Sequence, residues 1–191
     1  MKRYLSIALA VFILALPCLT LFSGCSAPSP NSEARVAIVD QLTVLQPNQV
    51  FIDQVTADLE TYGLKVDVYQ GKEVSVKFYR ELPQYGYKLI IFRAHSGMMQ
   101  RKEGSPMGAL EATYLLTGEA YTEMKYVREQ LTYQVLAARV MEGYPLVFAI
   151  NPIFLLNSME GRFDNTAIIM KDCQCEASHI IEKDRSRSVP Y

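Results

Sequence analysis

Residues 87–97 read Tyr-Lys-Leu-Ile-Ile-Phe-Arg-Ala-His-Ser-Gly, an apolar run that leads directly into a histidine between small residues. A short continuous apolar run that ends in turn-type residues is typical of a β-strand buried within a sheet. The segment therefore predicts an interior strand, and His95 follows the carboxyl end of that strand.

The segments before this strand alternate between strand and helix patterns. Strands are expected at 34–40 and 64–69, and helices are expected between Asn48 and Gly63 and at 74–82. The order strand, helix, strand, helix, strand with short connections is typical of a parallel sheet with helices on its faces. We therefore predict an α/β fold.

The segments after it contain fewer clear signals. Residues 98–121 predict a loop over the end of the sheet, with or without a β-hairpin. A helix is expected at 122–141, a buried strand at 146–150, a helix at 153–159 and a last strand at 166–170. The last strand would belong to the same sheet.

The N-terminus carries an export signal. Lys2 and Arg3 precede the uncharged apolar run 4–22, and small residues stand directly before Cys25. This arrangement is typical of a secretory signal, and its end resembles the lipobox of bacterial and archaeal lipoproteins. The resemblance implies cleavage after residues 1–24 and lipidation of Cys25. An uncleaved signal anchor is the alternative, and both place the domain at the cell membrane, facing the extracytoplasmic side.

The remaining chain divides into three parts. Residues 25–33 predict a tether, 34–173 a single α/β domain and 174–191 a polar, poorly ordered tail. Without residues 1–24, 17 basic side chains (19 less Lys2 and Arg3) stand against 20 acidic ones, a net charge of −3. This charge offers no basis for binding nucleic acid. We expect the partners to be the membrane and a peptide or protein substrate.

Two predicted strands end in residues that can carry chemistry. His95 follows one buried strand, and Cys173 follows the last one. Catalytic groups gather beyond the carboxyl ends of the strands in an open parallel sheet. An imidazole near a thiol accepts the proton of that thiol or stabilises the thiolate, as a cysteine hydrolase requires. Backbone N–H groups at Ser96 and Gly97 would then bind the oxyanion, with Gly97 allowing a close turn.

The same segments resemble the caspase-like (clan CD) cysteine peptidase fold. The matching segments are Ile-Val-Asp at 38–40, Tyr-Lys-Leu-Ile-Ile at 87–91 leading into His-Ser-Gly, and Ile-Ile-Met at 168–170 before a cysteine. The resemblance implies a three-layer α/β sandwich with a mostly parallel sheet, in which His95 is the catalytic histidine and Cys173 the nucleophile. In that fold further strand and helix follow the nucleophile, whereas 174–191 lacks both patterns, so a domain incomplete at the C-terminus is implied.

Each of these residues also has a structural interpretation. A histidine at a strand end is often a hydrogen-bonded structural residue, and a free cysteine such as Cys173 often behaves as a small buried hydrophobe. Cys173, Cys175 and His179 are spaced as metal ligands, but a tetrahedral site needs a fourth ligand, so we predict no metal and no cofactor. Asp40, at the end of the first strand, either orients a substrate or caps the next turn.

Two functions follow from these observations. The first is a membrane-anchored extracytoplasmic caspase-like protein, either an active Cys/His peptidase or an inactive remnant of one. The alternative is a non-catalytic lipoprotein binding module on the same scaffold. Asp172 favours the alternative because its charge disfavours a thiolate on the next residue, and the long segment 98–142 offers a surface for recognition.

Overall fold

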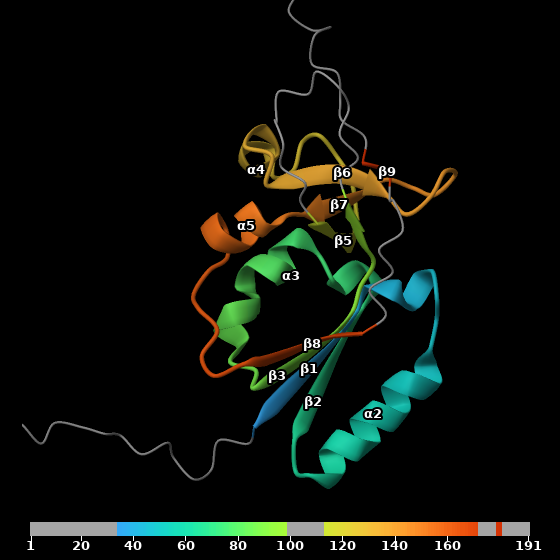
Figure 1. Cartoon of the computed structure of the whole chain (residues 1–191), viewed down its shortest axis with the longest axis vertical. Coiled ribbons are helices and arrows are strands. Elements are labelled where there is room, and N and C mark those ends of the chain that lie inside the picture. Colours follow the sequence, from blue (N-terminus) through green and yellow to red (C-terminus); the bar gives the residue numbers. More distant parts are fainter. Residues whose placement is uncertain (1–33, 99–112, 172–178, 181–191) are drawn as a thin grey trace, which may run out of the picture. The chain divides into compact units, whose positions relative to one another are not determined.

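The structure is a computed structural model that describes residues 34–98, 113–171 and 179–180. Its first sheet has four parallel strands in the order β2 (Lys65–Gln70), β1 (Arg35–Asp40), β3 (Leu89–Arg93) and β8 (Ala167–Lys171). The second has five antiparallel strands in the order β4 (Ser96–Met98), β5 (Thr113–Ala120), β7 (Val147–Ile150), β6 (Val135–Arg139) and β9 (His179–Ile180). Figure 1 shows both sheets. The predicted α/β fold with a parallel sheet is confirmed.

The helices of the parallel sheet lie on its two faces. Successive strand residues point to opposite faces, and in β3 the ring of Phe92 stacks on Tyr79 whereas Arg93 lies over Phe51. Tyr79 belongs to α3 (Val76–Glu81) and Phe51 to α2 (Gln49–Thr61), so these two helices cover opposite faces (Figure 1). Asn48 accepts a hydrogen bond from the N–H of Phe51 at 3.1 Å, which caps α2 as its sequence predicts.

The remaining helices are short. They are α4 (Val127–Leu131), α5 (Pro152–Asn157) and the 3₁₀ turns η2 (Gln41–Val44), η3 (Gly71–Glu73) and η4 (Leu82–Tyr85). The helix expected at 153–159 corresponds to α5, which begins with proline after Asn151.

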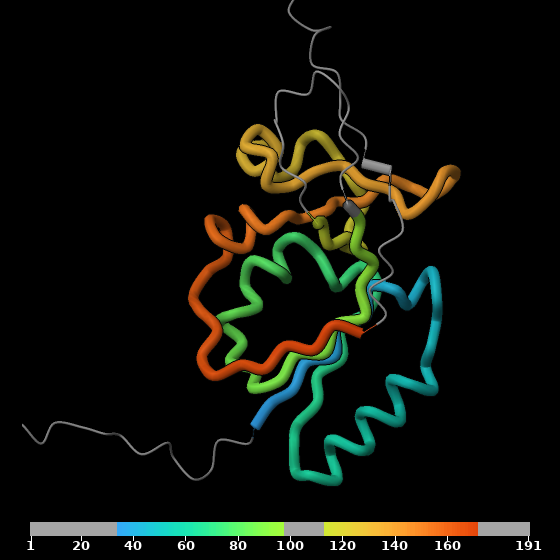
Figure 2. The backbone as a smooth tube through the Cα atoms, in the orientation of Figure 1, coloured from blue at the N-terminus to red at the C-terminus, as the bar shows by residue number. Residues whose placement is uncertain are grey.

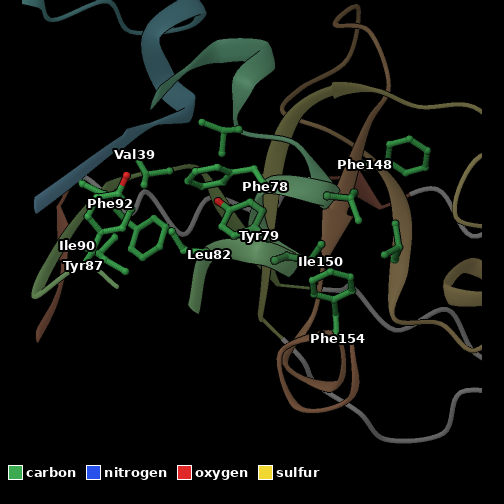
Figure 3. Packing of buried hydrophobic residues seen from close by; sticks show 14 residues of the cluster. Val39, Phe78, Tyr79, Leu82, Tyr87, Ile90, Phe92, Phe148, Ile150 and Phe154 are labelled. Carbon is green, nitrogen blue, oxygen red and sulfur yellow. The ribbon is translucent and has the colours of Figure 1, made fainter. Parts of the chain in front are cut away.

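One apolar cluster joins the two sheets. On the parallel sheet it includes Val39, Ile90 and Phe92, and from the antiparallel sheet Phe148 and Ile150 enter the same cluster. Figure 3 shows these side chains together with those of α3 and with Phe154 of α5. The α3 face of the parallel sheet and one face of the antiparallel sheet therefore share a core.

The predicted helix at 122–141 is wrong. This stretch forms α4, a break at Tyr133, where φ is +57°, and then strand β6. Val135 and Ala138 are fully buried, and β6 pairs with β7, so tertiary pairing overrides the helix propensity of the Leu-Ala-Ala stretch. The buried strand expected at 146–150 is confirmed as β7, which lies in the antiparallel sheet.

Within 98–121 the structure describes strand β5, which pairs antiparallel with β4 so that Gly97 is opposite Tyr114. Residues 99–112, where the β-hairpin was considered, lie outside the described residues. Strand β9 lies within the predicted polar tail, where no strand was expected, and Ile180 pairs with Ala138 of β6. The signal, the tether, Cys25 and most of the tail lie outside the described residues. None of the helices in the described ranges has the length and apolar character of a membrane span.

A polar network lies toward the amino end of the parallel sheet. Asp67 of β2 accepts hydrogen bonds from Arg35 at 2.5 Å and from the hydroxyl of Tyr87 at 2.9 Å. The hydroxyls of Tyr87 and Tyr69 are 2.7 Å apart. Burial alone would raise the pKa of Asp67, but the hydrogen bonds from Arg35 and Tyr87, with the charge of Arg35, lower this pKa below its ordinary value of 3.8.

This network predicts an acid-dependent loss of stability. A lowered pKa in the folded state stabilises the fold above pH 3.8, and this contribution disappears as the pH falls through the lowered value. Asp67→Asn should therefore lower the free energy of unfolding at pH 7 and make it less dependent on pH between 5 and 2. Urea unfolding across this range tests the prediction, with Asp53→Asn on the exposed side of α2 as the control. Equal pH profiles for the two variants would contradict it.

Candidate functional site

His95 lies where the chain passes from the parallel sheet to the antiparallel one. It follows β3, precedes β4, and is only 4% exposed. Its backbone is held on both sides, because its N–H donates to Oε1 of Gln41 at 2.9 Å and its carbonyl accepts from the N–H of Leu116 at 3.0 Å. His95 is therefore at the carboxyl edge of the parallel sheet, as predicted, in a fixed backbone position.

A buried ion pair lies two residues before the histidine. Nη1 of Arg93, at the end of β3, is 2.9 Å from Oδ1 of Asp40, at the end of β1, and their side chains are 2% and 0% exposed. Arg93 also donates to the carbonyl of Gln46 at 3.0 Å, and Gln70 donates to Asp40 at 3.4 Å. Burial raises the pKa of Asp40 above its ordinary value, although the charge of Arg93 opposes the change.

This ion pair was not found from the sequence. Asp40 was expected to cap a turn or to orient a substrate, whereas its carboxylate pairs with Arg93, and no side-chain cap of η2 is present. The available signal was that two of the predicted strands end in a charged residue, one acidic and one basic. In the parallel register these two residues are directly opposite each other.

Two cations approach one ring on the α2 face of the sheet. The guanidinium carbon of Arg93 is 5.6 Å, and Nζ of Lys171 is 5.1 Å, from the centre of the Phe51 ring. Lys171 is the last residue of β8, and the register places it opposite Arg93 of β3. The carboxyl ends of β3 and β8 are therefore neighbours, as the path of the chain in Figure 2 also shows.

Ser96 and Gly97 lie in a different setting from the one predicted. Both belong to β4, where Ser96 is opposite Leu115 and Gly97 is opposite Tyr114, and Ser96 is fully buried. The backbone here forms part of a sheet, whereas we expected a tight turn past a substrate. An extended strand is available to any residue, so Gly97 is not required here for a left-handed conformation.

The proposed nucleophile is beyond the described part of the chain. Asp172, Cys173 and Cys175 lie outside the described ranges, which on β8 end at Lys171. Arg93 and Lys171 are a register pair, and His95 and Cys173 each follow that pair by two residues. Among the residues that the structure describes, no group of three or more His, Cys, Asp or Glu side chains is placed to hold a metal ion.

No protein-family model matches this chain, and comparisons with curated proteins and with solved structures found no significant similarity. The resemblance to caspase-like peptidases therefore depends on the sequence motifs alone.

Proposed function

We propose that this chain is a caspase-like protein that is held at the extracytoplasmic side of the cell membrane, by lipidated Cys25 or by an uncleaved apolar segment, and that carries a Cys/His hydrolase site. The observation that supports it is the parallel pairing of β3 with β8. A hydrolase built from His95 and Cys173 requires the two strands before them to be neighbours with their carboxyl ends at one edge.

The surroundings of β3 and β8 also suit this site. Backbone hydrogen bonds hold His95 on both sides, and fixed geometry is what a general base needs. Lys171 carries a positive charge two residues before Cys173, and a nearby cation favours a thiolate. The helices α2 and α3 on opposite faces of the parallel sheet are compatible with the three-layer arrangement of the caspase-like fold.

The proposed reaction is the hydrolysis of a peptide bond. His95 accepts the proton of the Cys173 thiol, and the sulfur forms a bond to the scissile carbonyl carbon, whose oxygen becomes an oxyanion. When the C–N bond breaks, the leaving amine takes the proton from the imidazole. Water, deprotonated by the same imidazole, then releases the acyl group and regenerates the thiol.

A second function is favoured by the burial of His95. At 4% exposure, with both backbone polar groups satisfied, His95 is also placed as a structural residue at the junction between the sheets. In that case the chain is a non-catalytic binding module on the same scaffold, in agreement with Asp172 beside the thiol.

The reactivity of Cys173 distinguishes the two functions. In a hydrolase site the imidazole keeps the thiol partly ionised below its usual pKa of about 8.5, so iodoacetamide should alkylate Cys173 at pH 6 at least about ten times faster in the native chain than in His95→Ala. Mass spectrometry identifies the labelled cysteine and separates it from Cys175.

The chain offers a matched control for this experiment. His179→Ala removes the other histidine of the chain and should leave the alkylation rate of Cys173 unchanged. Equal rates in the native chain and His95→Ala would exclude the hydrolase site and favour the binding module. Cleavage of a peptide library that disappears in Cys173→Ser but persists in Cys175→Ser would exclude the binding module as the whole function.

A further inference from the structure

The described domain begins at the amino edge of the parallel sheet. The first strand, β1, starts at Arg35, and the carbonyl of Arg35 accepts from the N–H of Lys88 at 2.9 Å. The carbonyl of Lys88 in turn accepts from the N–H of Ala167 at 2.9 Å, at the start of β8. The start of β1 is therefore two strand spacings, about 10 Å, from the start of β8.

The segment that leads into β8 exposes large apolar side chains. Leu155 and Leu156 of α5 are 38% and 83% exposed, and Phe163 in the following loop is 37% exposed. We call these three residues the α5–β8 surface. In Figure 1 the chain from α5 to β8 runs along the side of the domain on which β1 begins. Exposed apolar side chains that gather in one segment indicate a contact surface, whereas single ones are ordinary.

The charges in this segment are balanced. Two exposed cations, Lys88 and Arg162, stand against two exposed carboxylates, Glu160 and Asp164. The surface therefore has no electrostatic preference for an acidic or a basic partner. Apolar side chains beside polar and cationic ones fit a lipid interface, where the apolar groups enter the acyl region and the charged ends stay at the level of the headgroups.

The N-terminal attachment would hold this surface close to a bilayer. Residues 25–33 separate Cys25 from the first described residue, Ala34, and nine residues reach about 30 Å at full extension. A short flexible link makes the second contact intramolecular, with an effective concentration on the order of millimolar. Three apolar side chains can then hold the domain against the bilayer, although they would bind it weakly without the link.

We propose that the α5–β8 surface docks onto the lipid bilayer to which the chain is anchored, with Leu156 and Phe163 inserted among the acyl chains. The proposal rests on the membrane anchoring of the proposed function, and it does not depend on the chain being a hydrolase. The amino edge of the parallel sheet then lies toward the bilayer. His95, at the carboxyl edge, faces away from the lipid and is reached from the aqueous side.

A single introduced tryptophan tests the docking, because the chain has none of its own. The full-length Leu156→Trp chain is reconstituted into phosphatidylcholine vesicles with or without brominated acyl chains. Bromine should remove at least about half of its emission, because an inserted side chain lies about 5–10 Å into the interface. Val44→Trp is the matched control, since Val44 is 78% exposed in η2, after the carboxyl end of β1, and its emission should not change.

A charged substitution tests the same surface from a second position. In the Leu156→Trp chain, Phe163→Asp should reduce the quenching, because a carboxylate resists entry into the acyl region. Val50→Asp, on the exposed side of α2, should leave the quenching unchanged. Far-ultraviolet circular dichroism checks that each variant is folded.

Flotation of the vesicles separates the two proposals. A chain that does not float with the vesicles would overturn the anchoring, and the docking with it. A chain that floats but is quenched no more at position 156 than at position 44 would overturn the docking alone. Emission shifted to shorter wavelengths without quenching by bromine would also overturn it, because the surface would then be covered by protein.

Discussion

Arg93→Met should lower the free energy of unfolding by about 3–5 kcal/mol, because removing one member of a buried ion pair leaves the other charge without compensation. Here the remaining charge is the fully buried carboxylate of Asp40. The guanidinium also donates to the carbonyl of Gln46, so the variant loses this contact between β3 and the segment before α2. Urea or thermal unfolding measures the loss.

A double variant separates the effect of the uncompensated charge on stability from the effect of lost packing. Asp40→Leu/Arg93→Met removes both charges, and a well-packed apolar replacement of a buried pair is often close to neutral. The double variant should therefore recover most of the stability that Arg93→Met loses. The loss in Arg93→Met should also shrink as the pH falls, since protonation of Asp40 removes the isolated charge. A single variant as stable as the native chain would show that the pair does not stabilise this edge of the sheet.

Gly118→Ala should lower the free energy of unfolding by about 3 kcal/mol, the upper end of the usual cost of overpacking, or prevent folding. A Cβ added at Gly118 would lie 1.8 Å from the carbonyl oxygen and 2.3 Å from the carbonyl carbon of Gly71. Both are backbone atoms, so no side chain can move aside. The N–H of Gly118 also donates to the carbonyl of Val74 at 2.8 Å, which fixes β5 against η3.

Gly143→Ala is the control for this prediction. Gly143 has a φ of +88° and nothing within 4 Å of an added Cβ, so alanine there meets only the backbone strain of the left-handed region, about 1–2 kcal/mol. The difference between the two variants in urea unfolding isolates the close approach of β5 to η3. An equal loss of stability in the two variants would contradict the prediction, because it would show that the backbones of β5 and η3 can move apart at little cost.

The parallel sheet could be predicted because its signals are local. A continuous apolar run marks β3, and Asn48 marks the start of α2, and both are confirmed in the structure. Local signals failed where pairing between strands decides the secondary structure. The segment Val135–Arg139 has helix-forming residues and is nevertheless a strand, because β7 lies beside it. In the same way, an apolar run at 147–150 does not show which of two sheets it will join.

The candidate site was predictable to a similar degree. The position of His95 at a sheet edge follows from the strand before it. The bond from its N–H to Gln41 joins residues 54 positions apart, and no spacing rule indicates such a contact. The pairing of Asp40 with Arg93 likewise depends on which strands are neighbours, since the sequence orders the strands along the chain but not across the sheet.

The apolar cluster that Phe148 and Phe154 share with Val39 and Phe92 has a consequence for cooperativity. Neither half of the polypeptide has a complete interior without the other, so a fragment that ends before β4 would expose one side of its sheet to water. We therefore expect the two sheets to unfold in a single cooperative transition. Because His95 lies at the junction of the two sheets, we expect local unfolding of either sheet to change the surroundings of its imidazole.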